Sequence, residues 1–201
     1  MRRSSQSLSR KSNNRKGRLR LFFALWPPEA VARDLHAWAA AVHANAEAAL
    51  AGSGGRVTRE STIHMTLAFL GDLPDDRVAS LIECGRRVRA APIDLTLDEG
   101  RWWKHNQVVW AGPRRLPEAL GDLVAQLESR LKDAGFEIEA REFRAHVTLV
   151  RRASIAAEGL PPLEPSGWRA AEFVLVSSVL TPQGPDYRIL ARFALMATNA
   201  R

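Results

Sequence analysis

The chain has 201 residues, of which 46% are apolar and 25% are charged, and this composition is typical of a soluble globular protein with one or two lobes. No apolar run approaches the ~20 residues that cross a bilayer, so we expect neither a spanning segment nor a membrane partner. The formal net charge of +7 belongs mainly to residues 1–17, which hold six basic and no acidic residues. The rest of the chain carries 23 basic and 22 acidic residues, and this near-neutral balance argues against a surface that binds a long stretch of nucleic acid.

Residues 1–17 are rich in Ser, Asn and Arg and carry little apolar surface. Such a segment cannot bury enough side chain to offset its conformational entropy, so we expect a disordered basic tail there. A transit peptide or a non-specific nucleic-acid contact would fit its composition, and a dispensable extension is the interpretation we favour. A single domain is then expected over residues 18–201.

The first half of this domain alternates strands and helices. Apolar periodicity and turn signals predict strand, helix, strand, helix and strand over residues 18–25, 27–50, 62–70, 75–90 and 93–97. The first helix begins with prolines, which suit a first helical turn. This order predicts sheet strands that are covered by helices.

The second half repeats this organisation. It predicts a strand, a helix and a strand over residues 107–111, 117–135 and 144–150, followed by strands over 172–180 and 188–195. In both halves, Pro-Glu-Ala opens the helix that precedes a His-x-Thr-Leu segment. We therefore expect an α+β fold in which two pseudo-symmetric lobes of antiparallel or mixed sheet carry helices on the outside.

The chain has one cysteine, Cys84, inside the helix predicted over residues 75–90. One cysteine excludes an internal disulfide and fits a reducing compartment, so we expect a cytoplasmic protein. A cysteine in an apolar helical stretch is more often a packed, inert thiol than a nucleophile.

Two segments of the chain have nearly the same sequence: His64-Met65-Thr66-Leu67 and His146-Val147-Thr148-Leu149. Residues i and i+2 of a strand point to one face, so each copy presents an imidazole and a hydroxyl together while its apolar residues face the core. Two imidazoles that face one cleft supply a general acid and a general base. The matched pair favours catalysis over two unrelated structural histidines.

These segments, in this order, resemble the two-histidine (2H) phosphoesterases, and among them the RNA 2′,3′-cyclic phosphodiesterase family, also called 2′-5′ RNA ligases. The resemblance covers about residues 18–195 and leaves the basic tail outside. Besides the His-x-Thr-Leu segments, it rests on residues 20–25, 68–72, 109–112, 150–151, 178–180 and 184–187. The family usually has proline before the second histidine, where this chain has Ala145, a change that removes no chemical group.

The resemblance implies a bilobal structure in which the two His-x-Thr strands line a central cleft. It also implies metal-free hydrolysis of a 2′,3′-cyclic phosphate on RNA ends or nucleotides to a 2′-phosphate, without a cofactor; we expect a monomer. His64 would be the general acid that protonates the leaving 3′ oxygen, and His146 the general base. The hydroxyls of Thr66 and Thr148 would donate hydrogen bonds to the non-bridging oxygens. In ligation, the reverse reaction of some relatives, the histidines exchange roles.

The resemblance also places a phosphate-binding arginine five residues after the second histidine, at Arg151. Strict strand alternation disagrees, because even-numbered residues share the face of His146, and this favours Arg152. A β-bulge or the end of the strand would restore Arg151. The same alternation predicts that Phe69 lies in the core.

Other functions stay open at this stage. A hydrolase of small cyclic nucleotides, a 2′-5′ RNA ligase and a non-catalytic binder of RNA ends could all use the same cleft. A zinc protein is disfavoured, because zinc sites need three or four ligands and neither histidine has a carboxylate or cysteine at ligand spacing. Trp102 or Trp103 could stack a base, although packing is the simpler expectation.

Overall fold

The computed structural model describes residues 17–138, 142–155, 159–182 and 184–196. Of the predicted basic tail, only Gly17 belongs to this part of the chain, and the rest of the tail lies outside the described residues. No helix in the described ranges combines the length and the apolar character that crossing a bilayer requires.

The helices and strands follow the predicted order. They are β1 (Arg18–Leu25), α1 (Glu29–Ala49), β2 (Arg56–Val57), β3 (Met65–Pro74), α2 (Val78–Arg86), β4 (Ile93–Leu97), β5 (Glu99–Trp103), β6 (Val108–Gly112), α3 (Glu118–Asp133), β7 (Val147–Arg151), β8 (Ser166–Ala170), β9 (Glu172–Thr181) and β10 (Gly184–Ala194). Short 3-10 helices at Glu60–Thr62 and Asp75–Arg77 precede β3 and α2. Every predicted element is present, and most boundaries shift by a few residues.

The sequence did not predict β2, β5 or β8. In β5, Gly100 lies against Trp38, and a Cβ atom at this position would come within 2.6 Å of the indole. The strand therefore needs a glycine for this close approach, although an isolated glycine in a sequence is more typical of a turn or a bulge.

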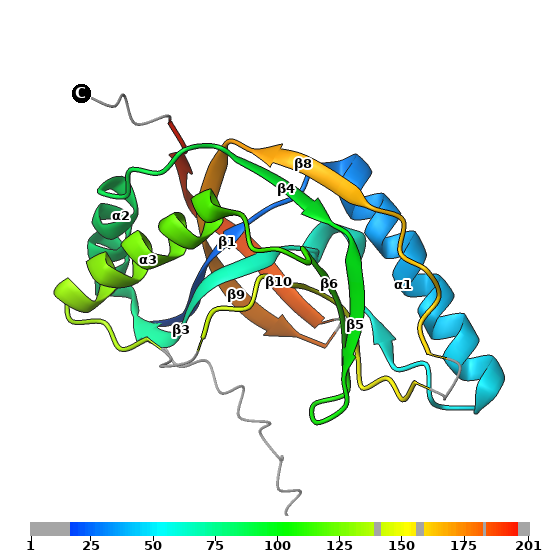
Figure 1. The fold of residues 1–201 in the computed structure, drawn as a ribbon. Helices are drawn as coiled ribbons and strands as arrows, with labels where there is room; N and C mark the ends of the chain where they lie inside the picture. Colours follow the sequence, from blue (N-terminus) through cyan, green and yellow to red (C-terminus); the bar gives the residue numbers. More distant parts are fainter. Residues whose placement is uncertain (1–16, 139–141, 156–158, 183, 197–201) are drawn as a thin grey trace, which may run out of the picture.

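One antiparallel sheet runs through the molecule in the strand order β10-β9-β1-β3-β7-β6-β5, with β2 paired to β7. Strands β4 and β8 form a separate antiparallel pair. The two halves of the large sheet meet where β3 and β7 pair at one position, Met65 with Val147. In Figure 1, α2 and α3 lie together on one side of the molecule and α1 lies on the other. The α+β fold with two lobes is confirmed.

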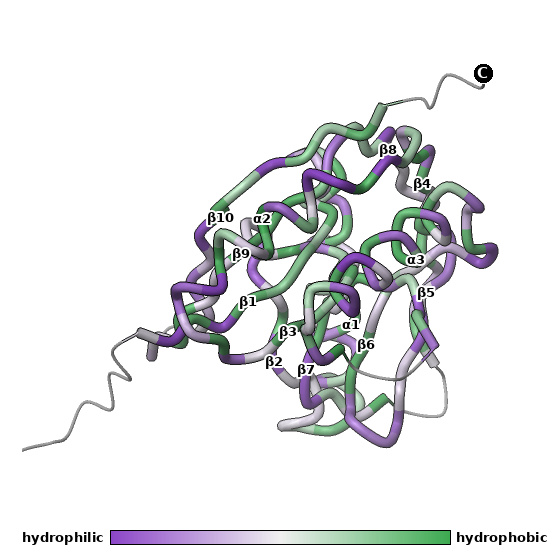
Figure 2. The backbone as a smooth tube through the Cα atoms, turned by 90° about the vertical axis from the view of Figure 1, so that its left-hand side faces the viewer, coloured by the Kyte–Doolittle hydropathy of each residue, from purple (hydrophilic) through white to green (hydrophobic). Residues whose placement is uncertain are grey.

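The two long helices each bury one apolar stripe. Its members recur every three or four residues: Val31, Leu35, Trp38 and Val42 in α1, and Leu120, Leu123, Leu127 and Leu131 in α3. Full burial of one such side chain contributes about 1.5–3 kcal/mol, so the stripes hold the helices in place. Figure 2 shows hydrophobic residues along much of β1 and an alternation of hydrophilic and hydrophobic residues along α3.

Each His-x-Thr strand contains a β-bulge at the same place. The register of β3 with β1 skips Leu67, and the register of β7 with β6 skips Leu149. Two consecutive residues are therefore buried in each strand, at 67–68 and at 149–150. A bulge reverses the alternation of faces beyond it, so the residue five positions after each histidine returns to the face of that histidine.

Candidate active site

The single pairing between β3 and β7 brings the two His-x-Thr segments together. The strands pair at the residues that directly follow the two histidines. Continuing this antiparallel register sets Thr66 opposite His146 and His64 opposite Thr148. Because the paired apolar residues are buried, the four polar side chains share the other face, where the lobes meet.

A backbone carbonyl two residues upstream orients each histidine. Nδ1 of His64 lies 2.7 Å from the carbonyl oxygen of Thr62, and Nδ1 of His146 lies 2.7 Å from that of Arg144. A carbonyl oxygen only accepts, so Nδ1 carries a hydrogen and donates it. Nε2 is then the ring nitrogen whose protonation changes. The sequence repeat thus extends to the orientation of the side chains.

All five residues predicted for the site line one cavity of about 90 Å³. Its polar and charged lining residues are Arg56, Thr58, Arg59, Thr62, His64, Thr66, His146, Thr148, Arg151 and Tyr187. Arg152 does not line it; this residue is exposed just beyond the end of β7, with φ at 60°. The bulge at Leu149 turns Arg151 rather than Arg152 to the face of His146.

Three aromatic rings enclose His64. The indole of Trp26 stacks on the imidazole, with 5.2 Å between centroids and 14° between planes. The ring of Phe22 lies at 4.9 Å, and Tyr187 meets the imidazole edge-on at 5.2 Å. Little water can reach the part of the His64 imidazole that these three rings cover.

The enclosure changes the proton affinity of His64. Burial lowers its pKa from 6.5 to about 4, and the nearby Arg151 and His146 act in the same direction with smaller effect. The hydrogen bond to Thr62 opposes the shift, because donation to a carbonyl favours the imidazolium. His64 is therefore neutral at pH 7 in the unliganded protein.

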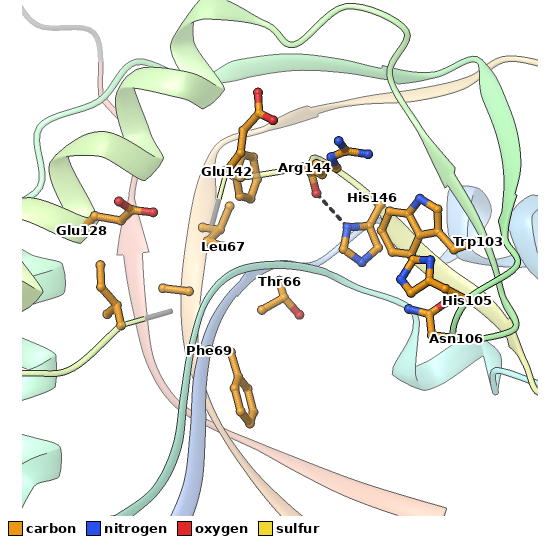
Figure 3. A pocket seen from close by; sticks show the side chains of 13 residues that line it. Thr66, Leu67, Phe69, Trp103, His105, Asn106, Glu128, Glu142, Arg144 and His146 are labelled. Carbon is orange, nitrogen blue, oxygen red and sulfur yellow. Dashed lines mark hydrogen bonds between the residues drawn. The ribbon is translucent and has the colours of Figure 1, made fainter. Parts of the chain in front are cut away.

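A larger cavity of about 590 Å³ adjoins the small one and shares Thr66 and His146 with it (Figure 3). Trp103, His105 and Asn106 lie beside His146 at one end of this cavity. The Trp103 ring meets the imidazole of His146 at a steep angle, 66°, with 4.7 Å between centroids. The two histidines therefore have different surroundings, and the cavity beside His146 is much larger than the small one that both histidines line.

Two predictions about aromatic residues have different outcomes. The prediction that Phe69 lies in the core is wrong: its side chain is 39% exposed and lines the larger cavity, because the bulge at Leu67 reverses the strand alternation. The guanidinium carbon of Arg20 lies 4.7 Å from the centroid of the Phe69 ring. Of the two tryptophans, Trp103 lines the cavity, whereas Trp102 packs on the core and donates its indole N–H to a backbone carbonyl.

Sequence reasoning missed three residues that surround the His-x-Thr segments. Trp26 follows β1, while Arg56 and Arg59 lie in and just after β2. Two arginines within eight residues of His64 were an available signal for an anionic ligand. Nothing in the sequence pointed to Trp26, because it packs on a histidine 38 residues away.

Within the residues that the structure describes, no three His, Cys, Asp or Glu side chains are placed to hold one metal ion. The thiol of Cys84 is buried in α2, and this burial raises its pKa. A protonated, buried thiol is a poor nucleophile, as the sequence predicted for this residue.

The family model described as "LigT like Phosphoesterase" matches residues 25–110 and 111–187 of this chain. The RNA 2′,3′-cyclic phosphodiesterase of Escherichia coli is 34% identical over 176 residues, which are 88% of this chain and 96% of that protein. The protein of the same name from Thermus thermophilus is 30% identical and covers 91% of this chain and 93% of its own length.

Solved structures agree with these relatives. The crystal structure of E. coli LigT complexed with 3′-AMP superimposes with a TM-score of 0.79 at 31% identity, over 90% of this chain and 99% of that one. A crystal structure described as a phosphoesterase gives the same TM-score and identity over 89% of this chain. The family model, the sequence relatives and the fold thus lead to one conclusion: this chain belongs to the LigT-like phosphoesterase family.

Proposed function

We propose that this protein hydrolyses 2′,3′-cyclic phosphates on RNA ends and nucleotides and leaves a 2′-phosphate. The observation that carries the proposal is the placement of two histidine–threonine couples and Arg151 around one small cavity. The relatives named RNA 2′,3′-cyclic phosphodiesterase, which match most of the chain, support the same substrate class.

The two histidines perform the two proton transfers that hydrolysis needs. His146 accepts a proton from a water molecule as the water oxygen forms a bond to phosphorus. The bond between phosphorus and the 3′ oxygen breaks, and His64 gives a proton to this oxygen. The product keeps its ester at the 2′ oxygen, and the phosphate gains the hydroxyl of the water. Proton transfer runs through Nε2 of each ring, because Nδ1 donates to a backbone carbonyl.

The remaining predicted residues hold the phosphate. The hydroxyls of Thr66 and Thr148 donate to non-bridging oxygens, and removal of one donor of this type commonly slows a reaction about 10²–10³-fold. Arg151 supplies a guanidinium that remains charged although burial lowers its pKa. These groups are fixed before the substrate binds, since they come from two paired strands.

Binding of the phosphate sets the protonation of His64. The acid role needs an imidazolium, whereas His64 is neutral at pH 7 in the unliganded protein. A phosphate anion beside the ring favours the charged form, so the proton arrives on His64 as the substrate binds. The larger cavity beside His146 then takes the nucleoside that carries the phosphate.

The proposal is tested with an RNA oligonucleotide that ends in a 2′,3′-cyclic phosphate, incubated in excess EDTA. We expect a 2′-monophosphate as the product, and a rate about 10²–10⁴-fold lower for His64→Ala and for His146→Ala. Arg152→Gln is the control, because this arginine lies outside the cavity. A 3′-monophosphate product, or activity that requires an added divalent metal, would contradict the proposal.

Two further expectations accompany this function. We propose a cytoplasmic location, in agreement with the buried thiol of Cys84. We also propose a monomer, because one chain supplies all five residues of the site. Light scattering during size-exclusion chromatography tests the second expectation.

A further inference from the structure

We propose that Arg56 and Arg59 form a second phosphate subsite, which binds the phosphate on the 5′ oxygen of the terminal nucleotide. This inference rests on the proposed function and specifies the preferred substrate. The site would favour cyclic phosphates that carry another phosphate one ribose away over nucleosides that carry the cyclic phosphate alone.

The two guanidinium groups converge on one end of the catalytic cavity. Both residues line the cavity, together with Arg151. Arg56 lies directly opposite Arg151 in the antiparallel pairing of β2 with β7. A methyl group at Gly184, where β10 begins, would lie 3.8 Å from Nη1 of Arg56 and 4.0 Å from Nη2 of Arg59. The tips of both side chains therefore reach the same point beside the β9–β10 turn.

Among the described residues, the positive charge at this end of the cavity has no acidic counterpart. In the described part of the chain, no carboxylate lines the cavity, and neither Arg56 nor Arg59 forms an ion pair. Arg59 donates instead to the backbone oxygen of Pro185. Like charges that face each other across a strand pair destabilise it, and Arg56 and Arg151 are such a pair. An anion between them would relieve this repulsion.

Tyr187 lines the same cavity as Arg56, Arg59 and Arg151. Burial raises the pKa of Tyr187, while the nearby charges of Arg151, Arg20, Arg59 and Arg56 act in the opposite direction. Because the phenol keeps its proton at neutral pH, it can donate a hydrogen bond to a bound anion. The subsite thus offers two guanidinium groups and one neutral donor.

One cyclic phosphate does not account for this much charge. A cyclic phosphodiester carries a single negative charge, and Arg151, the two hydroxyls and the histidines already surround its position. Arg56 and Arg59 add two further positive charges with planar donor groups that suit phosphate oxygens. The positive charge that exceeds the need of the cyclic phosphate matches a second anion close to it.

The shape of the substrate matches the two cavities. In a ribose 2′,3′-cyclic phosphate, the base is bonded to C1′, beside C2′, and the 5′ carbon is bonded to C4′, beside C3′. The base and the 5′ carbon therefore leave the sugar from opposite ends of the C2′–C3′ bond. With the base in the larger cavity beside His146, the 5′ carbon points away from that cavity. The arginine end of the small cavity lies outside the larger one, because neither Arg56 nor Arg59 lines it.

The test compares adenosine 2′,3′-cyclic phosphate with the same compound carrying a 5′-phosphate. We expect kcat/KM to be about tenfold higher for the 5′-phosphorylated compound, since an exposed charge pair is worth up to about fivefold and two guanidinium groups act together. The preference should decline as the salt concentration rises from about 20 to about 300 mM, because the arginines are exposed.

Variants locate the effect on the protein. Arg59→Gln and Arg56→Gln should each remove most of the preference, and Arg59→Lys should retain part of it because the charge remains. Arg152→Gln, an exposed arginine outside the cavity, should keep the full preference. The ratio of the two substrates is measured within one protein, so partial misfolding of a variant does not imitate the effect.

The outcomes separate this inference from the proposed function. Hydrolysis of neither compound would refute the proposed function and, with it, the subsite. Equal hydrolysis of both compounds would overturn the subsite and leave the function standing. A preference that survives in Arg56→Gln and Arg59→Gln would overturn the assignment to these arginines and give the 5′-phosphate to other residues. Weaker product inhibition in Arg56→Gln and Arg59→Gln, without a change in the preference for the 5′-phosphorylated compound, would also overturn the subsite. That result would assign these arginines to the product phosphate.

Discussion

Removal of the indole that stacks on His64 should return this histidine towards an ordinary pKa. The Trp26 ring lies 5.2 Å from the imidazole and nearly parallel to it, so Trp26→Ala opens one of three aromatic walls to water. Water stabilises the imidazolium, and the pKa of His64 should therefore rise. Tyr187→Phe is the matched control, because it keeps the edge-on ring and removes only the hydroxyl.

The size of the expected pKa change follows from the ordinary and the lowered pKa of His64. The difference between 6.5 and about 4 corresponds to about 3 kcal/mol against charging His64 in the folded protein. If each of the three rings contributes a similar share, the loss of one raises the pKa to about 5. Tyr187→Phe should leave the pKa of His64 close to its wild-type value.

The assay is an NMR titration of the His64 ring between about pH 3 and pH 8. Kinetics give a second readout of the pKa of His64. A cyclic phosphodiester keeps one charge over this pH range, so the acid limb of the pH profile of kcat/KM reports groups of the unliganded enzyme and not of the substrate. A wild-type His64 that titrates near the ordinary histidine value would refute the reasoning about its enclosure. An unchanged value in Trp26→Ala would refute the role of the stacked ring.

Four other predictions concern the same site. Thr66→Val and Thr148→Val should each lower kcat about 10²-fold while the thermal midpoint moves little; a larger loss of stability than of activity would make these hydroxyls structural. The double variant His64→Ala/His146→Ala should be much less impaired than the product of the two single losses, because the residues act in one step; simple multiplication would speak against a shared step. The folded-state pKa of His64 lies below its unfolded value of 6.5, so its contribution to stability is full above pH 6.5 and is lost as the pH falls towards 4. In urea titrations, the unfolding free energy of the wild type relative to His64→Gln should fall by about 2 kcal/mol between about pH 7 and pH 4.5. A difference that stays constant over this range would contradict the linkage. Turnover should persist after dialysis against EDTA, and loss of activity that zinc restores would reverse that expectation.

The architecture could be predicted where local pattern and tertiary structure agree. The helices that follow Pro28 and Pro117 carry clear apolar stripes, and both appear close to their predicted bounds. Strand β5 could not be predicted in the same way, because Gly100 serves a contact with Trp38 that only the folded chain creates. The short strand β2 has two residues, too few for any periodic signal.

The four histidine and threonine positions could be predicted because the repeat encodes them directly. The choice between Arg151 and Arg152 could not be made from alternation, since it depends on a bulge at Leu149 that forms only against β6. The equivalent bulge at Leu67 puts Phe69 on the face opposite to the one that alternation predicts. A strand sequence contains no local mark of either bulge, because buried leucines occur in regular strands as well.

The aromatic enclosure and the arginine cluster depend on longer-range packing. Trp26 comes from the end of β1 and Tyr187 from β10, and they meet His64 only because β1 lies between β9 and β3. Their effect on the pKa of His64 is a property of this packing, and no residue type in the sequence carries it alone.

A substrate with sulfur in place of the 3′ oxygen tests directly whether the two histidines act on opposite sides of one phosphorus. A thiolate leaves without protonation, so the loss of a general acid should matter much less with this substrate. We expect His64→Ala to recover most of its lost rate on the 3′-thio substrate, whereas His146→Ala stays equally impaired on both substrates. Equal impairment of both variants on both substrates would contradict the assignment of an acid and a base to this pair.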